Sequence, residues 1–197
     1  MKMNLLAIVC LLLMGANVYG QQKKHSIEAG LGIWNTNEIL NTFSDMIVSS
    51  ALLPKGLEMK DDNSYGSAHL GYKYLCNKTF AIGGFAAYDY AKSKGVSDGK
   101  ETGKFYKTHY TFAVEAELTY LSKGNFNMYG LAGIGETFYH LKYKDNSDKN
   151  KNDSNMNPYT AFQITPVGLR YGRNAGAFVE LGFGYRGILN AGVFARF

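Results

Sequence analysis

The segment from Tyr106 to Tyr120 alternates between a mainly apolar and a mainly polar set of side chains, and this pattern constrains the fold more than any other feature. Its even positions read Tyr, Thr, Tyr, Phe, Val, Ala, Leu and Tyr, whereas its odd positions read Lys, His, Thr, Ala, Glu, Glu and Thr. Successive side chains of a β-strand point to opposite faces. The segment is therefore predicted to be a long strand with one apolar and one polar face.

Seven other segments carry a similar period of two, namely 25–34, 67–74, 80–90, 128–143, 158–171, 177–186 and 189–197. Within one of them, Phe162 and Ile164 lie on the opposite parity from Val167, and a bulge or bend at Pro166 would reconcile the two halves. Eight strands, an even number, predict an all-β fold, a closed antiparallel up-and-down barrel.

The connections between the predicted strands alternate in length. Short turns are expected at 75–79, 121–125 and 172–175, and the last hairpin near Gly187 is also short. Long loops on one side and tight turns on the other are typical of transmembrane barrels. The long loops are predicted at 35–64, 91–104 and 144–157.

The first long loop carries a helical signal, because apolar residues recur at helical spacing between Ile39 and Ile47. Asn35 and Glu38 form a candidate N-terminal capping pair, and Pro54 lies where the segment would end. A short helix is therefore expected. It lies over the barrel mouth or, as an alternative, presents its apolar stripe to lipid or a partner.

The predicted polar face is rich in glycine and alanine, which suits the inside of a narrow barrel better than a solvated surface. The apolar face carries aromatic residues near both strand ends, as expected for girdles at two membrane interfaces. A soluble periplasmic lipocalin-like binder, with the faces reversed, is the alternative. The aromatic residues are Tyr88, Tyr90, Tyr106, Tyr139 and Tyr143 near the loops, and Tyr72, Tyr74, Phe80, Tyr120, Tyr129, Tyr171 and Phe197 near the turns.

The N-terminus reads as a secretory signal peptide. Lys2 precedes an apolar run from Leu5 to Met14, and small or polar residues follow up to Gly20. The run is too short to cross a bilayer as a helix. We expect Sec-type export, cleavage near Gly20, and two segments: a signal peptide, 1–20, and an outer-membrane β-barrel domain, 21–197.

Composition narrows the possible functions. Without residues 1–20 the chain loses Lys2 and no acid, which leaves 20 basic and 16 acidic residues and a net charge of +4. The basic residues are scattered rather than gathered into a stripe, so no nucleic-acid partner is predicted. Cys76 is then the only cysteine, which excludes an intramolecular disulfide. No pattern of a metal or cofactor site is present, and neither is predicted.

The final strand ends in Val193-Phe194-Ala195-Arg196-Phe197, with an aromatic residue last. With this strand and the export signal, the chain resembles the small eight-stranded outer-membrane barrels of the OmpA-like or Opa-like class of Gram-negative cell envelopes. The resemblance implies integration into outer-membrane lipid. It also implies that Phe197 is the assembly signal through which the C-terminal strand is read by the barrel-assembly machinery.

By parity, six acidic and six basic side chains are predicted to point into the barrel. Unpaired buried charges are very costly, so they are expected to form a network of salt bridges that fills the lumen. The alternative is a narrow passive, porin-like pore. The twelve residues are Glu28, Lys73, Asp89, Lys107, Glu115, Glu117, Glu136, Lys142, Arg170, Glu180, Arg186 and Arg196.

A catalytic set is the remaining hypothesis, since some barrels of this class modify lipid A with a Ser, a His and an acid. The predicted inward histidines are His69, His109 and His140. No serine is visibly positioned as a nucleophile, so the chain is not predicted to be an enzyme. A structural or adhesive role through the long loops is expected instead, with a lipid A-modifying enzyme as the alternative.

Overall fold

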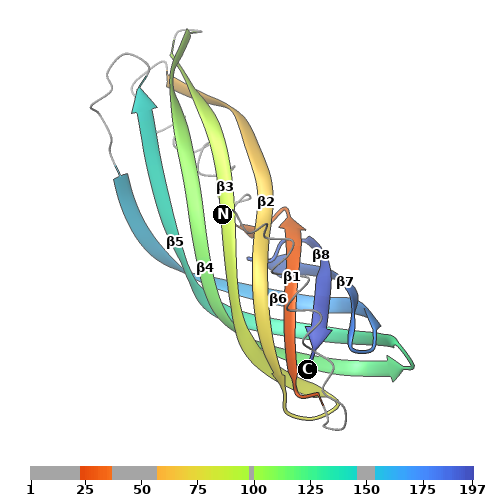
Figure 1. The fold of residues 1–197 in the computed structure, drawn as a ribbon. Coiled ribbons are helices and arrows are strands. Elements are labelled where there is room, and N and C mark those ends of the chain that lie inside the picture. Colours follow the sequence, from red (N-terminus) through yellow and green to blue (C-terminus); the bar gives the residue numbers. More distant parts are fainter. Residues whose placement is uncertain (1–22, 37–56, 98–99, 146–153) are drawn as a thin grey trace, which may run out of the picture.

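A computed structural model describes residues 23–36, 57–97, 100–145 and 154–197 (Figure 1). The predicted signal peptide, 1–20, and the predicted helix between Ile39 and Ile47 lie outside these residues. No helix in the described part of the chain is long and apolar enough to cross a bilayer.

Eight antiparallel strands form one sheet that closes on itself in sequence order, so the predicted fold is confirmed. Closure is made by β1, which pairs with β2 on one side and with β8 on the other. The strands are β1 (His25–Ile33), β2 (Leu57–Leu75), β3 (Phe80–Ser97), β4 (Lys100–Lys123), β5 (Phe126–Asp145), β6 (Ser154–Gly172), β7 (Ala175–Gly184) and β8 (Leu189–Arg196).

The barrel has two sides of very different height. The short wall consists of β1, β7 and β8, which have 9, 10 and 8 residues. The tall wall consists of β2 to β6, which have 18 to 24 residues each. Figure 1 shows β2 to β5 rising past the upper ends of β1 and β8. At roughly 3.3 Å per residue, β4 is about 80 Å long, whereas β8 is about 26 Å long.

The tall wall corrects the predicted loop boundaries. The range 91–104 is not a long loop, because β3 and β4 pair as far as Ser97 and Lys100. Residues 57–64 likewise belong to β2, and 144–145 and 154–157 belong to β5 and β6. These stretches are polar and lack a clear apolar face. Pairing with a neighbouring strand holds them in the sheet where their own sequence gives only a loop signal.

The bulge predicted near Pro166 is confirmed. The pairing of β6 with β7 shifts between Ile164 and Val167, and its pairing with β5 shifts between Leu131 and Tyr129. The shift changes which parity of β6 faces outward. As a result, Phe162 and Tyr171 both lie on the outer surface although they differ in parity.

Polarity is inverted relative to a water-soluble protein. On the outer surface Leu70 is 67 % exposed and Val114 is 62 % exposed, while inside the barrel Arg186 is fully buried. The expected girdle of aromatic residues near the turns is present on the outer surface. Its members are Tyr72, Tyr74, Phe80, Tyr120, Tyr171 and Phe197. Tyr129 is the exception, because it is buried in the lumen.

Candidate functional site: the charged interior of the barrel

The connection between β7 and β8 folds into the barrel and carries the central residue of the interior. Gly187 has a φ of 102°, a left-handed conformation that favours glycine. Gly32 of β1 lies so close to the carbonyl oxygen of Arg186 that no side chain fits there. These two glycines let the turn approach the wall and direct the Arg186 side chain into the lumen.

Arg186 binds three carboxylates from three strands. Its Nε donates to Oε1 of Glu115 at 2.7 Å and its Nη2 donates to Oε2 of the same residue at 2.5 Å. Nη2 also donates to Oε1 of Glu28 at 2.6 Å, and Nη1 donates to Oε2 of Glu180 at 3.1 Å. Such charge-assisted, two-pronged contacts fix geometry as well as supply energy.

A second group of ion pairs lies on the turn side of Arg186. Lys73 Nζ is 2.7 Å from Oε2 of Glu117 and 3.0 Å from Oε2 of Glu28. Arg170 donates to both carboxylate oxygens of Glu117, at 2.7 and 3.0 Å. Glu28 therefore joins this group to Arg186, and all of these side chains are part of one buried network.

Three neutral side chains complete the network. Tyr185 donates its hydroxyl hydrogen to Oε1 of Glu115 at 3.0 Å, and Tyr129 donates to Oε1 of Glu180 at 2.7 Å. Asn190 Nδ2 donates to Oε2 of Glu180 at 2.6 Å. The predicted network of charges did not include these residues. Both tyrosines belong by parity to the predicted outer face, whereas Asn190 belongs to the polar face but is uncharged.

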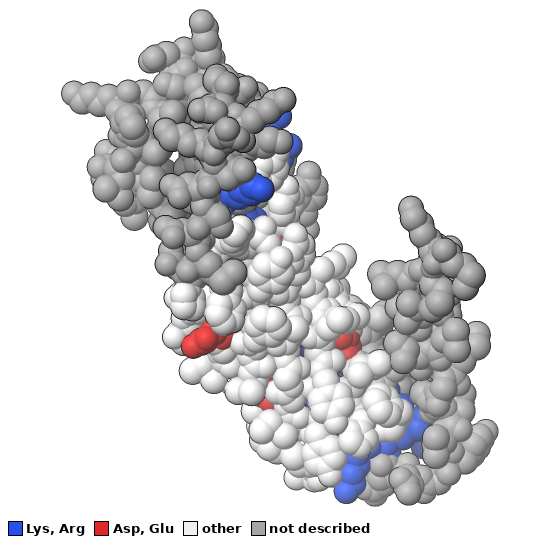
Figure 2. Space-filling view, turned by 60° about the vertical axis from the view of Figure 1, so that its left-hand side comes forward, with Lys and Arg blue, Asp and Glu red and all other residues white. Residues whose placement is uncertain are grey.

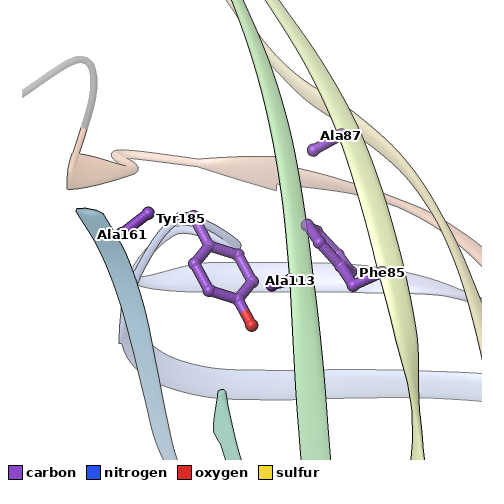
Figure 3. Packing of buried hydrophobic residues seen from close by; sticks show 5 residues of the cluster. All are labelled: Phe85, Ala87, Ala113, Ala161 and Tyr185. Carbon is purple, nitrogen blue, oxygen red and sulfur yellow. The ribbon is translucent and has the colours of Figure 1, made fainter. Parts of the chain in front are cut away.

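A small apolar layer covers the network. It is formed by Phe85, Ala87, Ala113, Ala161 and Tyr185, and Figure 3 shows the two rings turned toward each other across the lumen. The ring centroids of Phe85 and Tyr185 are 4.8 Å apart, and the guanidinium carbon of Arg186 lies 4.6 Å from the Phe85 centroid. At this level the lumen is filled by side chains.

Three other predicted residues lie inside the barrel but outside these ion pairs. Asp89 and Lys107 are buried on the tall wall, and Asp89 accepts a hydrogen bond from Nδ2 of Asn35 at 2.5 Å. Arg196 points inward at the turn end and forms no ion pair with the described carboxylates.

The predicted inward orientation is wrong for Glu136 and Lys142, which are exposed on the outer surface. Both belong to β5, where the odd residues face the lumen. The register with β4 sets this parity, because Phe112, an outward residue, is paired with Glu136. The same inversion turns Tyr139 inward, where its ring stacks on His109 at 4.8 Å.

Among the described residues, the histidines are not arranged as a recognisable catalytic set. His69 is buried with its ring 5.2 Å from that of Phe85, and neither of its ring nitrogens has a hydrogen-bond partner among the described residues. His140 shares the outward parity of Glu136 and Lys142. Within the described ranges, no group of His, Cys, Asp and Glu is arranged to hold a metal ion.

Phe197, the predicted assembly signal, lies at the turn end of the seam between β1 and β8. Its ring is exposed and stacks on His25 with centroids 5.7 Å apart. The backbones of the two residues exchange hydrogen bonds of 2.9 and 3.0 Å. Phe197 therefore closes the ladder of the last strand and adds to the outer girdle of aromatic residues.

These features define a closed eight-stranded barrel with a charged, filled interior and an apolar outer surface. No family model matches the chain, and a comparison with curated proteins also finds no match.

Proposed function

We propose that the chain is an integral outer-membrane β-barrel, exported by a signal peptide cleaved near Gly20, whose tall wall presents a binding surface outside the membrane. The inverted polarity is the observation that carries this proposal. A soluble barrel would expose its charged face to water, whereas this one encloses its charges and exposes Leu70 and Val114. The predicted OmpA-like or Opa-like resemblance agrees with this arrangement, and the proposed role is not enzymatic.

Strand length supports a surface role. A transmembrane β-strand needs about 9–11 tilted residues. The short wall has about this length, so the additional residues of β2 to β6 would extend beyond the bilayer on the loop side. Their outer face is no longer apolar, since it carries Glu136 and Lys142.

One patch of this outer face has a definite chemistry. Lys92, Tyr106 and Lys142 are paired neighbours on β3, β4 and β5 and share the outward parity. Lys92 Nζ lies 5.9 Å from the centroid of the Tyr106 ring. Two cations flanking an aromatic ring favour a partner with anionic groups and flat apolar surfaces, such as an acidic polysaccharide.

Cysteine labelling tests the orientation. Cys76 is free and exposed at the turn end. In intact cells expressing the chain with its native signal, a membrane-impermeant maleimide should label Cys76 only after permeabilisation. In a Cys76→Ser background, Lys142→Cys should be labelled in intact cells. The reverse pattern, or recovery of the protein in the soluble periplasmic fraction, would contradict the proposal.

Cell retention tests the binding role. Cells expressing the unmodified chain should be retained on heparin-coated beads more strongly than on albumin-coated beads. The double variant Lys92→Gln/Lys142→Gln should lose most of this retention, and Lys123→Gln, at the opposite end, should not. Equal retention of all three proteins would rule out the patch as the binding surface.

A further inference from the structure

The turn end of the barrel contains a cavity that the salt-bridge network does not fill. Its volume is about 440 Å³, and it lies below the ion pairs of Lys73, Glu117 and Arg170. Ser26 and Arg196, which are paired neighbours on β1 and β8, line one side, and Lys78 of the β2–β3 turn lines another.

Several polar atoms at this cavity have no hydrogen-bond partner among the described residues. The Oγ of Ser26 and the Nε atoms of Arg170 and Arg196 are buried, yet none forms a hydrogen bond within the described chain. Ser26 is 4 % exposed and Arg170 is 2 % exposed. An unsatisfied buried donor is costly, and such groups in a polar cavity call for a bound partner.

The charged residues around the cavity determine which charge that partner should carry. Lys73 and Arg170 are already paired with Glu117, but Arg196 has no ion pair with any described carboxylate, and Lys78 adds a further cation. The cavity lining therefore carries four basic side chains and one acidic side chain. A ligand that accepts hydrogen bonds and carries negative charge fits this lining.

The surface around the cavity has the same sign. Exposed basic residues surround the turn end, and the described residues there include no exposed Asp or Glu. Figure 2 shows Lys and Arg at the lower end, a second group of them near the upper end, and a few Asp and Glu on the otherwise uncharged surface between. The exposed basic residues are Lys24, Lys78, Lys123 and Arg173.

The geometry points to a binding site for a small oxyanion, a phosphate or carboxylate group, held in the turn-end cavity by the guanidinium of Arg196 and the hydroxyl of Ser26. Arginine presents a planar fork of donors that matches such oxyanions, and Lys78 adds a point charge at the cavity. The oxyanion is either a free ion or the headgroup phosphate of a lipid. The site is independent of the proposed partner at the tall wall, and only its lipid form depends on a membrane location.

Nuclear magnetic resonance on the full chain tests the site. The barrel is purified in lauryldimethylamine oxide micelles, which contain no phosphate, and inorganic phosphate is titrated in at constant ionic strength. The Nε–H resonance of Arg196 should shift saturably. Arg196→Gln and Ser26→Ala should each weaken the apparent affinity for phosphate by about tenfold or more. Because Arg196→Gln removes the reporting Nε–H group, its affinity is measured on the Nε–H resonance of Arg170. Arg173→Gln removes the same charge outside the cavity and should leave the affinity within about twofold.

Lipid nanodiscs distinguish the two sources of the oxyanion. A saturable shift with free phosphate identifies a site for a soluble ion. A shift seen with phosphatidylglycerol nanodiscs but not with free phosphate identifies a headgroup site, and phosphatidylcholine, whose phosphate is offset by its own cation, should give a smaller shift. No saturable shift in either arm, or equal weakening by Arg173→Gln, would overturn the proposal. Because Arg196 belongs to the closing strand, Ser26→Ala and Lys78→Gln provide the same test if Arg196→Gln does not fold.

Discussion

The short and tall walls share the same alternation of side chains, but they differ in strand length and in the residues that they contribute to the interior and to the outer surface. The short wall has 8 to 10 residues per strand and supplies Glu28, Glu180 and the turn that carries Arg186. The tall wall supplies Glu115, Glu117, Lys73 and Arg170 near its base, then continues upward with polar residues on its outer face. These buried ion pairs are thus concentrated in the lower half of the molecule.

The largest effect is expected at the joint between the walls. Arg186→Met would leave Glu28, Glu115 and Glu180 without their main cation, and breaking a buried pair from one side typically costs about 3–5 kcal/mol. Urea unfolding in lipid vesicles, followed by heat-dependent electrophoretic mobility, measures the loss. Lys142→Met, on the exposed tall wall, should change stability by about 0.5 kcal/mol or less. Similar stabilities for both variants would show that the network does not hold the walls together.

The stability cost of a charge on the outer surface should be larger in the apolar band that faces the membrane than in the region above it. Val114→Arg places a cation in the middle of the apolar surface, where the cost in a bilayer is about 2–4 kcal/mol. Thr160→Arg, beside Glu136 on the tall wall, should cost about 1 kcal/mol or less. The same unfolding measurement applies. Equal costs for the two substitutions would contradict a boundary between these positions.

The fit of the β7–β8 turn against β1 predicts an intermediate effect. Gly32→Ala introduces a Cβ where the carbonyl oxygen of Arg186 already lies, and overpacking of this kind costs about 1–3 kcal/mol. Gly84→Ala is the control, because a Cβ there meets no atom within 4 Å. In micelles, the midpoint temperature of unfolding should be clearly lower for Gly32→Ala than for Gly84→Ala. A tolerated Gly32→Ala would mean that the turn is not held in the lumen.

The smallest effect is expected at the top of the tall wall. Residues 94–104 can be replaced by Asn-Gly, which joins the paired residues Ser93 and Phe105 through a two-residue hairpin turn. Since this tip lies far from the network, stability should change by about 1 kcal/mol or less. The midpoint of urea unfolding tests this. A large loss would show that the upper strands support the barrel and are not only a surface.

The number of strands, their order and the Pro166 bulge followed from the sequence because alternation is strong wherever one face is apolar. The alternation failed on β5, where both parities carry large apolar residues and periodicity alone is ambiguous. Small residues did not resolve the ambiguity, because Gly130 and Ala132 lie on one parity and Gly133 and Gly135 on the other. In the structure a Cβ on Gly133 or Gly135 would collide with Tyr185 or Ala113 inside the barrel, a contact that the sequence alone does not show.

Other features depend on tertiary contacts and were not available from the sequence. Tyr185 continues the outward parity of β7, but Gly184, with a φ of 141°, redirects the chain and turns the ring inward. The upper parts of β3 and β4 lack a clear apolar face and are held as strands by pairing with each other and with β2 and β5. The participation of Tyr129 in the network follows from the inverted β5.

The position of Arg186 in the chain also sets an order of assembly. Its contact with Glu28 joins residues 158 positions apart, across the place where the first and last strands meet. Until the final hairpin is in place, Glu115 and Glu180 lack the cation that they share, whereas Glu28 still has Lys73, so a half-closed barrel leaves two buried carboxylates without an ion pair among the described residues. Closure of the seam therefore completes the network, and opening the seam separates Glu28 on the first strand from Arg186 beside the last one.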